Sequence, residues 1–255
     1  MNRIHLIRNG AVAELRLDNP DKMNALSSEM LGQLASHLDA IERDADLRAV
    51  MLTAEGDRAF CTGADINSWG DLGAAEFARH WVRDGHRIFD RLARMSKPTV
   101  AVLNGHAFGG GLELATACDI RVMAPTGALA LPEAGIGIVP GWSGTQRLLR
   151  LLPEPVVREM ALFGHRIKAD RALAYGFVAA VDPDPRNVAE RLLDRALTLS
   201  PRAVEVTKWM LNAAEGEDRG AMIEALGSAA ISASDDRAEG VTAFREKRKP
   251  HFPGR

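Results

Sequence analysis

Residues 99–114 read TVAVLNGHAFGGGLEL, and this stretch decides the fold that the sequence predicts. Its first five residues are a strand pattern, with valine and leucine at 100, 102 and 103. The strand leads through Asn104-Gly105 to three consecutive glycines, and a short helix with leucines at 112 and 114 follows them. A strand and a helix joined by a tight turn indicate one unit of an α/β fold.

The segments on either side alternate between strand and helix patterns. Residues 4–17 alternate apolar and polar side chains around Asn9-Gly10, which predicts a β-hairpin. Apolar residues at helical spacing predict a helix from Ser27 to Arg43, with Ser27 as its cap. Further along we expect a strand over 49–52, a loop over 59–66, a helix over about 74–95 and a strand over 119–122. This alternation predicts α/β layers joined by right-handed crossovers.

The last quarter of the chain has a different pattern. Residues 182–185 read Asp-Pro-Asp-Pro and are expected to form a linker. From 188 to 249 the pattern is helical and rich in alanine. We therefore divide the chain into a core over 1–187 and a helical region over 188–255.

Composition excludes several classes of protein. The 255 residues carry 32 Lys and Arg against 34 Asp and Glu, a net charge of −2, so there is no basic excess for binding nucleic acid. Two cysteines, Cys61 and Cys118, fit a reducing compartment. No apolar run approaches the 18 residues or so of a membrane span, and residues 1–6 have no signal core. We expect a cytoplasmic protein that binds neither membranes nor nucleic acid.

Common cofactor and metal signatures are missing from the sequence. The glycine run at 109–111 has Leu114 where a dinucleotide fingerprint needs glycine, and the stretch from Gly135 fails likewise at Pro140. There is no Walker loop, no Gly-x-Ser-x-Gly elbow and no His-Glu-x-x-His motif. The closest histidines, His80 and His86, are six residues apart on different faces of a helix, so we expect no metal site.

The glycine run and two glutamates are the candidate chemistry. Glycines before a helix leave backbone N–H groups unshielded, and those groups can stabilise negative charge on an oxygen. Glu113 follows in the first helical turn, and Glu133 lies in an apolar stretch 20 residues later. Two carboxyls in apolar surroundings are suited to acid–base catalysis. Each feature also has a purely structural interpretation. The glycines would form a tight packing turn, Glu113 would interact favourably with the helix dipole, and Glu133 would be exposed on a turn.

Six separated blocks, in order, resemble the crotonase superfamily, the enoyl-CoA hydratase/isomerase family. They are NP at 19–20 with MNAL at 23–26, FCTGADI at 60–66, KP at 97–98 with NGHAFGGGLEL at 104–114, PE at 132–133 with GIVPG at 137–141, GTQRL at 144–148, and FREKR at 244–248. The resemblance covers nearly the whole chain. It implies a spiral of ββα turns, followed by a helical C-terminal region that builds trimers or hexamers.

The resemblance also implies a mechanism. An acyl-CoA thioester would bind with its carbonyl oxygen between the backbone N–H groups of Ala64 and Gly110, and the missing Cβ of Gly110 would let it approach. Family members that hydrate a double bond carry two glutamates, which match Glu113 and Glu133. Glu113 would help to activate a water, Glu133 would supply or remove the α-proton, and the N–H of Gly141 would help to hold the water. Coenzyme A is part of the substrate, and no other cofactor is implied.

Residues for the rest of the substrate follow from the same matching. Those assigned to coenzyme A or the acyl group are Lys22, Ala25, Leu26, Ala64, Asp65, Ile66, Gly110, Trp142, Phe244 and Lys247. Phe244 and Lys247 would reach coenzyme A from a C-terminal helix, which could belong to a neighbouring subunit. Lys247 could instead belong to a solvated helix end. Trp142 departs from the family pattern, in which alanine follows the glycine, and its indole either enters the acyl pocket or packs against a helix.

The sequence therefore predicts an enoyl-CoA hydratase that adds water reversibly, in syn fashion, to a 2-enoyl-CoA of fatty acid metabolism and forms a 3-hydroxyacyl-CoA. One alternative is another crotonase reaction on an acyl-CoA: double-bond isomerisation, thioester hydrolysis or C–C cleavage. The other is a non-catalytic member that binds acyl-CoA or RNA, for which the basic segment 245–249 is the support.

Overall fold

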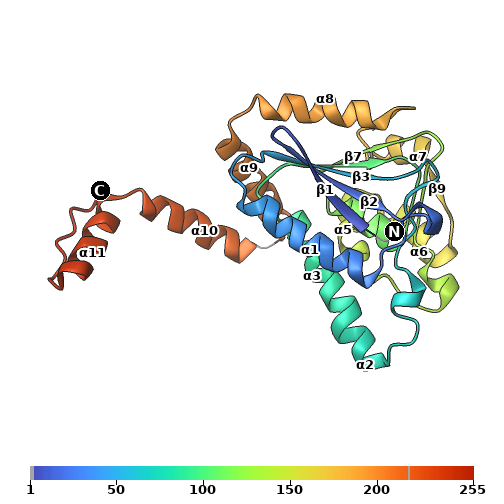
Figure 1. Cartoon of the computed structure of the whole chain (residues 1–255), viewed down its shortest axis with the longest axis horizontal. Helices are drawn as coiled ribbons and strands as arrows, with labels where there is room; N and C mark the ends of the chain where they lie inside the picture. The colour runs from blue at the N-terminus through green and yellow to red at the C-terminus, as the bar shows by residue number, and fades with distance from the viewer. Residues whose placement is uncertain (1–2, 218) are drawn as a thin grey trace. The chain divides into compact units, whose positions relative to one another are not determined.

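The computed structural model describes residues 3–217 and 219–255 (Figure 1). The chain forms two compact units, Met1–Val206 and Thr207–Arg255. The division falls inside helix α9 (Pro201–Ala214). All residues of the candidate chemistry except Phe244 and Lys247 are in the first unit.

The larger sheet of the first unit has six strands. Its order is β1-β2-β3-β5-β7-β10, and all neighbours are parallel except the hairpin β1–β2. The strands are β1 (Arg3–Asn9), β2 (Val12–Asp18), β3 (Ala49–Ala54), β5 (Thr99–Leu103), β7 (Ile120–Met123) and β10 (Ala180–Val181). The predicted hairpin, turning at Asn9-Gly10, is confirmed.

A second sheet has four short strands, in the order β4-β6-β8-β9. They are β4 (Ala59–Cys61), β6 (His106–Phe108), β8 (Ala128–Ala130) and β9 (Ile167–Lys168). The sequence prediction of a loop from residue 59 was wrong over 59–61, and it missed β6 and β8. Strands of three residues are too short to display the alternation by which strands are recognised.

The chain alternates between the two sheets. It passes from β3 to β4, from β5 to β6 and from β7 to β8, and helices follow the first two of these pairs before the chain returns to the larger sheet. Each turn thus places one strand in each sheet, which is the predicted spiral of ββα units. The second turn carries the glycine run from β6 into helix α4 (Gly110–Thr116).

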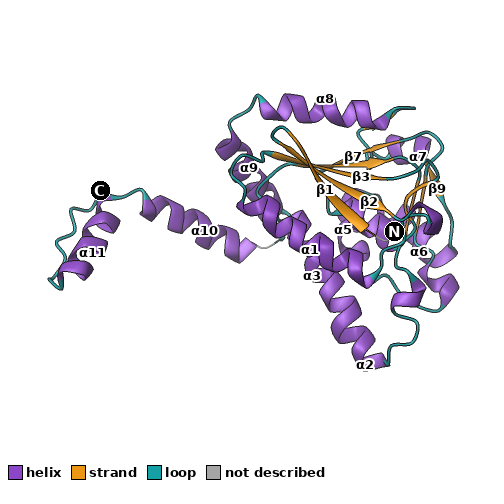
Figure 2. Ribbon diagram, in the orientation of Figure 1, coloured by secondary structure: helices purple, strands orange, loops and turns teal. Residues whose placement is uncertain are grey.

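Helices cover both faces of the larger sheet (Figures 1 and 2). Along β3, Val50 and Leu52 join the main core together with α1 (Ser28–Arg43) and α3 (Arg83–Ala93). The alternate residues, Ala49 and Met51, pack with Ala189 and Leu193 of α8 (Pro185–Leu197) on the other face. Because a parallel sheet is buried on both faces, its strands read as continuous apolar runs.

An ion pair fixes α8 to its face of the sheet. Arg186 donates two hydrogen bonds to the buried carboxylate of Glu14, at 2.9 and 2.7 Å, and Thr53 donates a third at 2.8 Å. Burial alone would raise the pKa of Glu14, but these donors lower it below its usual value. Helix α8 thus belongs to the first compact unit, which continues past the linker at 182–185.

The predicted helix over 74–95 is present with an irregularity. It consists of α2 (Ala74–Glu76), a π-helical segment (Phe77–Val82) and α3. The predicted helix behind Ser27 is also confirmed, since Ser27 Oγ accepts a hydrogen bond from the Met30 N–H at 3.2 Å. π-Helical segments are rare and are frequently found at functional sites.

Further helices follow in both units. In the first unit they are α5 (Gly144–Leu151), α6 (Glu154–Phe163) and α7 (Ala169–Ala174). The second unit contains α10 (Arg219–Ser232) and α11 (Asp235–Glu246). Within the described residues, no helix has the length and apolar character required to cross a membrane. The assignment of 188–255 to oligomerisation stays a prediction.

Candidate active site

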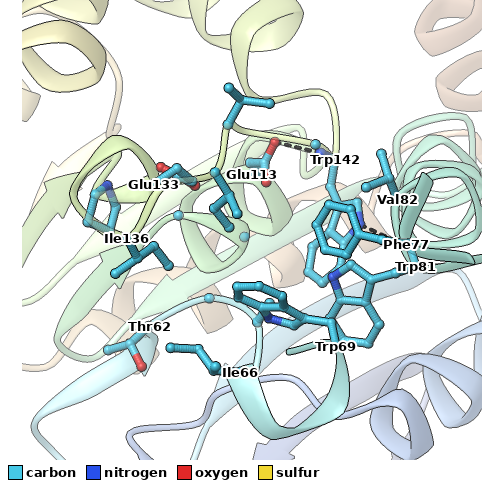
Figure 3. A pocket seen from close by; sticks show the side chains of 18 residues that line it. Thr62, Ile66, Trp69, Phe77, Trp81, Val82, Glu113, Glu133, Ile136 and Trp142 are labelled. Carbon is cyan, nitrogen blue, oxygen red and sulfur yellow. Dashed lines mark hydrogen bonds between the residues drawn. The ribbon is translucent and has the colours of Figure 1, made fainter. Parts of the chain in front are cut away.

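A pocket of about 250 Å³ lies where α4 begins, and Figure 3 shows its lining side chains. Segments far apart in the sequence form its wall. They are the loop from Thr62 to Trp69, the π-helical segment, the glycines before α4, residues 132–139 and the pair Gly141-Trp142. Glu113 and Glu133 are the carboxyl groups among the lining residues. The structure therefore brings the two predicted glutamates to one cavity.

Glu113 is held by main-chain N–H groups. Its side chain points from the first turn of α4 and is 2% exposed. Oε1 accepts hydrogen bonds from the backbone N–H groups of Trp142 and Gly144, both at 2.7 Å. A Cβ at Gly144 would lie 2.7 Å from that same oxygen, so this position requires glycine. Two donors on one oxygen fix the orientation of the carboxyl group.

Glu133 has a different environment. It begins a 3-10 turn (Glu133–Ile136) after β8 and is 6% exposed. Among the described residues no group forms a hydrogen bond with its Oε2, although that atom is buried. Gly109 lies against this carboxyl group, because a Cβ there would come 2.8 Å from Oε1. Gly109 also has φ 50 and ψ −127, a conformation that side chains rarely adopt.

Burial raises the pKa of both carboxyl groups. For Glu113 the N–H donors of Gly144, Trp142 and Gly141 oppose the rise without cancelling it. For Glu133 burial raises the pKa to about 7, and the nearby Glu113 contributes to the rise. A carboxyl group with a pKa near neutrality can both give and accept a proton at physiological pH.

We expect the buried carboxyl of Glu133 to make stability depend on pH. Its pKa is about 7 in the folded protein against an ordinary value of 4.5, so the folded state retains a proton that the unfolded state releases between these values. The free energy of unfolding then falls as pH rises from 4.5 to 7 and is flat above. Between pH 5 and pH 8 the free energy of unfolding, measured in urea, should fall by about 2–3 kcal/mol more in the unmodified protein than in Glu133→Gln. Glu154→Gln, which alters an exposed carboxyl on α6, is the control. An equal pH dependence in all three proteins would contradict the assignment.

Two backbone N–H groups border the same pocket, those of Ala64 and Gly110. Gly110 is the first residue of α4, where an N–H has no partner within the helix. Neither amide donates a hydrogen bond to another group of the described chain. The two segments are in close contact, since a Cβ at Gly63 would lie 3.3 Å from the nitrogen of Gly110. This pair of donors can bind one oxygen atom that carries negative charge.

The indole of Trp142 both lines the pocket and packs against α3. Its Nε1–H donates to the carbonyl oxygen of Trp81 at 3.2 Å. A Cβ at Gly85 would lie 2.2 Å from Nε1, and one at Gly110 would lie 2.7 Å from Cζ3. The prediction that the missing Cβ of Gly110 gives space to a ligand is therefore corrected, because the indole occupies that space. The two orientations that the sequence left open are compatible.

The segment that holds Glu113 is tied to α3. Ser143 has φ 77, unusual for a residue other than glycine. Its Oγ lies 3.1 Å from His86 Nδ1 and 3.4 Å from Asp90 Oδ1. Arg147 donates a hydrogen bond to the same Asp90 Oδ1 at 2.7 Å. These contacts support the left-handed turn that aims the N–H groups of residues 142 and 144 at Glu113.

The predicted site residues divide into those that line the pocket and those that do not. Ala64, Ile66, Gly110, Gly141 and Trp142 line it.

Lys22 forms an ion pair with Asp65 at 2.6 Å, which lowers the pKa of Asp65. Leu26 is fully buried, and its N–H and carbonyl oxygen bond to Gly63 and Asp65. Phe244 is 85% exposed, and Lys247 ends α11 with φ 53; both belong to the second compact unit. For Lys22, Ala25, Leu26, Asp65, Phe244 and Lys247 a role in binding coenzyme A stays a prediction.

Sequence reasoning missed much of the pocket wall. Phe77, Trp81 and Val82 line it, together with Ile136, Ile138 and Val139. It also missed the donors to Glu113 from residues 142 and 144. One signal was available, since three of the four tryptophans of the chain line this pocket.

Comparison with known proteins gives consistent similarities. The family model described as Enoyl-CoA hydratase/isomerase matches residues 7–255. A short-chain-enoyl-CoA hydratase of Clostridium acetobutylicum is 34% identical over 255 residues, covering 98% of this chain and 97% of the relative. A crotonyl-CoA hydratase of Syntrophomonas wolfei is 36% identical over 251 residues, covering 94% of each chain. The crystal structure of an enoyl-CoA hydratase from Bacillus anthracis superposes with a TM-score of 0.81 at 32% identity and covers 100% of both chains.

Proposed function

Because the chain belongs to the enoyl-CoA hydratase/isomerase family, we propose that it is an enoyl-CoA hydratase, which adds water reversibly to a 2-enoyl-CoA and forms a 3-hydroxyacyl-CoA. The observation that carries this proposal is the pair of buried glutamates on one apolar pocket, beside two free N–H groups. The relatives named as hydratases support the same reaction.

The thioester carbonyl oxygen is bound by the N–H groups of Ala64 and Gly110. Addition of water to the β-carbon places negative charge on this oxygen as the enolate forms. Both donors are in place before the reaction, so they stabilise the enolate without reorganisation. One such donor is worth on the order of 3 kcal/mol in the activation free energy.

The two glutamates divide the proton transfers. Glu113 accepts a proton from the attacking water while the oxygen of that water bonds to the β-carbon. Glu133 donates a proton to the α-carbon of the enolate. The product gains one molecule of water, and proton exchange between the carboxyl groups restores the starting state. The N–H of Gly141, which also acts on the carboxyl group of Glu113, contributes to holding the water.

Binding of the remainder of the substrate follows the family pattern. The nucleotide and pantetheine of coenzyme A run past Lys22, Ala25, Leu26, Asp65 and Ile66. Phe244 and Lys247 contact it from a C-terminal helix, either that of this chain or that of a neighbouring subunit. The protein acts in the cytoplasm as a homotrimer or as a hexamer made of two trimers. The reaction needs no metal or separate cofactor, because the carboxyl and N–H groups named above account for each step.

Crotonyl-CoA tests this proposal directly. Hydration removes the conjugated double bond, so the expected result is loss of enoyl-thioester absorbance with formation of 3-hydroxybutanoyl-CoA. Release of free thiol would indicate thioester hydrolysis instead. Conversion of 3-enoyl-CoA to 2-enoyl-CoA without hydration would indicate an isomerase. Absence of any turnover, with RNA affinity that falls steeply with salt, would favour the non-catalytic alternative.

A further inference from the structure

The side of the pocket opposite the glutamates is built from aromatic rings. Trp69, Phe77, Trp81 and Trp142 line it. In Figure 3 Trp69, Phe77 and Trp81 lie away from Glu133, whereas the backbone of Trp142 is bonded to Glu113. The ring centroids of Trp69 and Phe77 lie 5.5 Å apart, and those of Trp81 and Trp142 lie 5.3 Å apart. Aromatic residues make up only 5% of the chain, so this concentration is local.

The π-helical segment brings two of these rings to the pocket. Phe77 and Trp81 both lie in it, and Val82 beside them also lines the cavity. Trp81 is 8% exposed, and its carbonyl oxygen accepts the hydrogen bond from Trp142. One irregular turn therefore supplies both ring surface and the acceptor that fixes a third ring.

Trp142 makes this wall rigid. Its indole fills the space that a Cβ at Gly85 or at Gly110 would need. It also meets the ring of Phe89 edge-on, with the ring centroids 5.2 Å apart. It is 3% exposed. Because close-packed rings have no adjacent space to enter, a ligand cannot widen the pocket on this side by moving the indole.

The pocket has room for an acyl group that carries a ring. An apolar cavity of about 150 Å³ holds a benzene ring. The pocket measures about 250 Å³, so it has room for one ring and the three-carbon thioester unit between the glutamates and the N–H groups. A crotonyl group carries only a methyl group beyond that unit and would leave most of the aromatic wall without a contact.

We propose that the natural acyl group is a 2-enoyl unit with an aromatic ring on its β-carbon, as in cinnamoyl-CoA. This substrate class rests on the proposed hydratase function. The ring packs among Trp69, Phe77 and Trp81, in the offset or edge-to-face arrangements that aromatic pairs favour. Water adds to the β-carbon and a proton to the α-carbon, so no oxidant or reductant is involved.

Saturated CoA thioesters test the fit of the pocket without turnover. By titration calorimetry on the full-length protein, 3-phenylpropanoyl-CoA should bind at least about 10-fold more tightly than butanoyl-CoA, since each added buried carbon lowers the dissociation constant by roughly fourfold at most. It should also bind more tightly than 3-cyclohexylpropanoyl-CoA and decanoyl-CoA. Tighter binding of any of the other three would overturn the proposal.

Turnover is measured separately, as dehydration of 3-hydroxy-3-phenylpropanoyl-CoA, which restores conjugation with the ring. Dehydration of this compound, together with the tighter binding of 3-phenylpropanoyl-CoA in calorimetry, supports the inference. Turnover of 3-hydroxybutanoyl-CoA alone, without the preference, leaves the hydratase assignment and overturns the aromatic substrate. The preference without turnover of either compound overturns the hydratase function and with it the aromatic enoyl substrate.

Variants locate the contact. Trp69→Leu should weaken binding of 3-phenylpropanoyl-CoA about 10-fold and that of butanoyl-CoA much less, and Trp69→Phe should recover most of the loss. Phe163→Leu, which changes a ring that is 75% exposed at the end of α6, is the matched control. Equal weakening of both ligands by Trp69→Leu would contradict stacking of the acyl ring on this residue and overturn the proposal.

Discussion

Glu133→Gln is expected to lower kcat for hydration of crotonyl-CoA by roughly 10²-fold or more and to change KM little. The amide has nearly the shape of the carboxyl group but cannot donate a proton to the α-carbon. The N–H groups of Ala64 and Gly110 are untouched, so binding of the thioester should persist. Steady-state rates on crotonyl-CoA measure this effect.

The pH profile separates proton donation from a structural effect. The pKa of Glu133 is about 7 because of burial, and the proposed mechanism of hydration uses its protonated form. The rate of hydration should therefore fall as pH rises through about 7, and dehydration, which requires the carboxylate, should fall as pH decreases through it. Glu133→Gln should lack this dependence, whereas Glu154→Gln on α6 should retain both rate and profile. A variant at position 133 with near-normal turnover would remove Glu133 from the mechanism.

Glu113→Gln is expected to reduce kcat by a similar factor, roughly 10²-fold or more, for a different reason. The glutamine oxygen can still accept the hydrogen bonds from Trp142 and Gly144, so the segment should stay in place. The variant nevertheless lacks a group that accepts the proton of the attacking water. Hydration of crotonyl-CoA measures the loss, and an unchanged denaturation midpoint would show that the fold persists.

Two further variants sharpen this second result. Glu29→Gln on the exposed face of α1 is the matched control and should be fully active. Combining Glu113→Gln with Glu133→Gln should cost much less than the product of the single effects, because both residues act on one water addition. Full additivity would mean that the two residues act independently of each other. Hydration by Glu113→Gln at the normal rate would mean that Glu113 takes no part in proton transfer.

The regular elements of the first compact unit follow from local sequence patterns. The hairpin around Asn9-Gly10, the capped helix behind Ser27 and the strand over 99–103 each have a period or a turn signal within a few residues. The short strands β4, β6 and β8 have none, because pairing with distant neighbours forms them. Their existence was implied by the family resemblance and by no local pattern.

The sequence by itself determined the family, the spiral of ββα turns and the identity of the two glutamates, since these depend on residue types at fixed positions along the chain. Only the tertiary structure decided how those groups are tuned. Glu113 receives its donors from residues 142 and 144, Glu133 owes its raised pKa to burial, and the indole of Trp142 fills the space beside Gly110. Burial, hydrogen-bond donors and packing come from segments that lie 20 or more residues from these groups along the chain. A local sequence pattern therefore does not contain them.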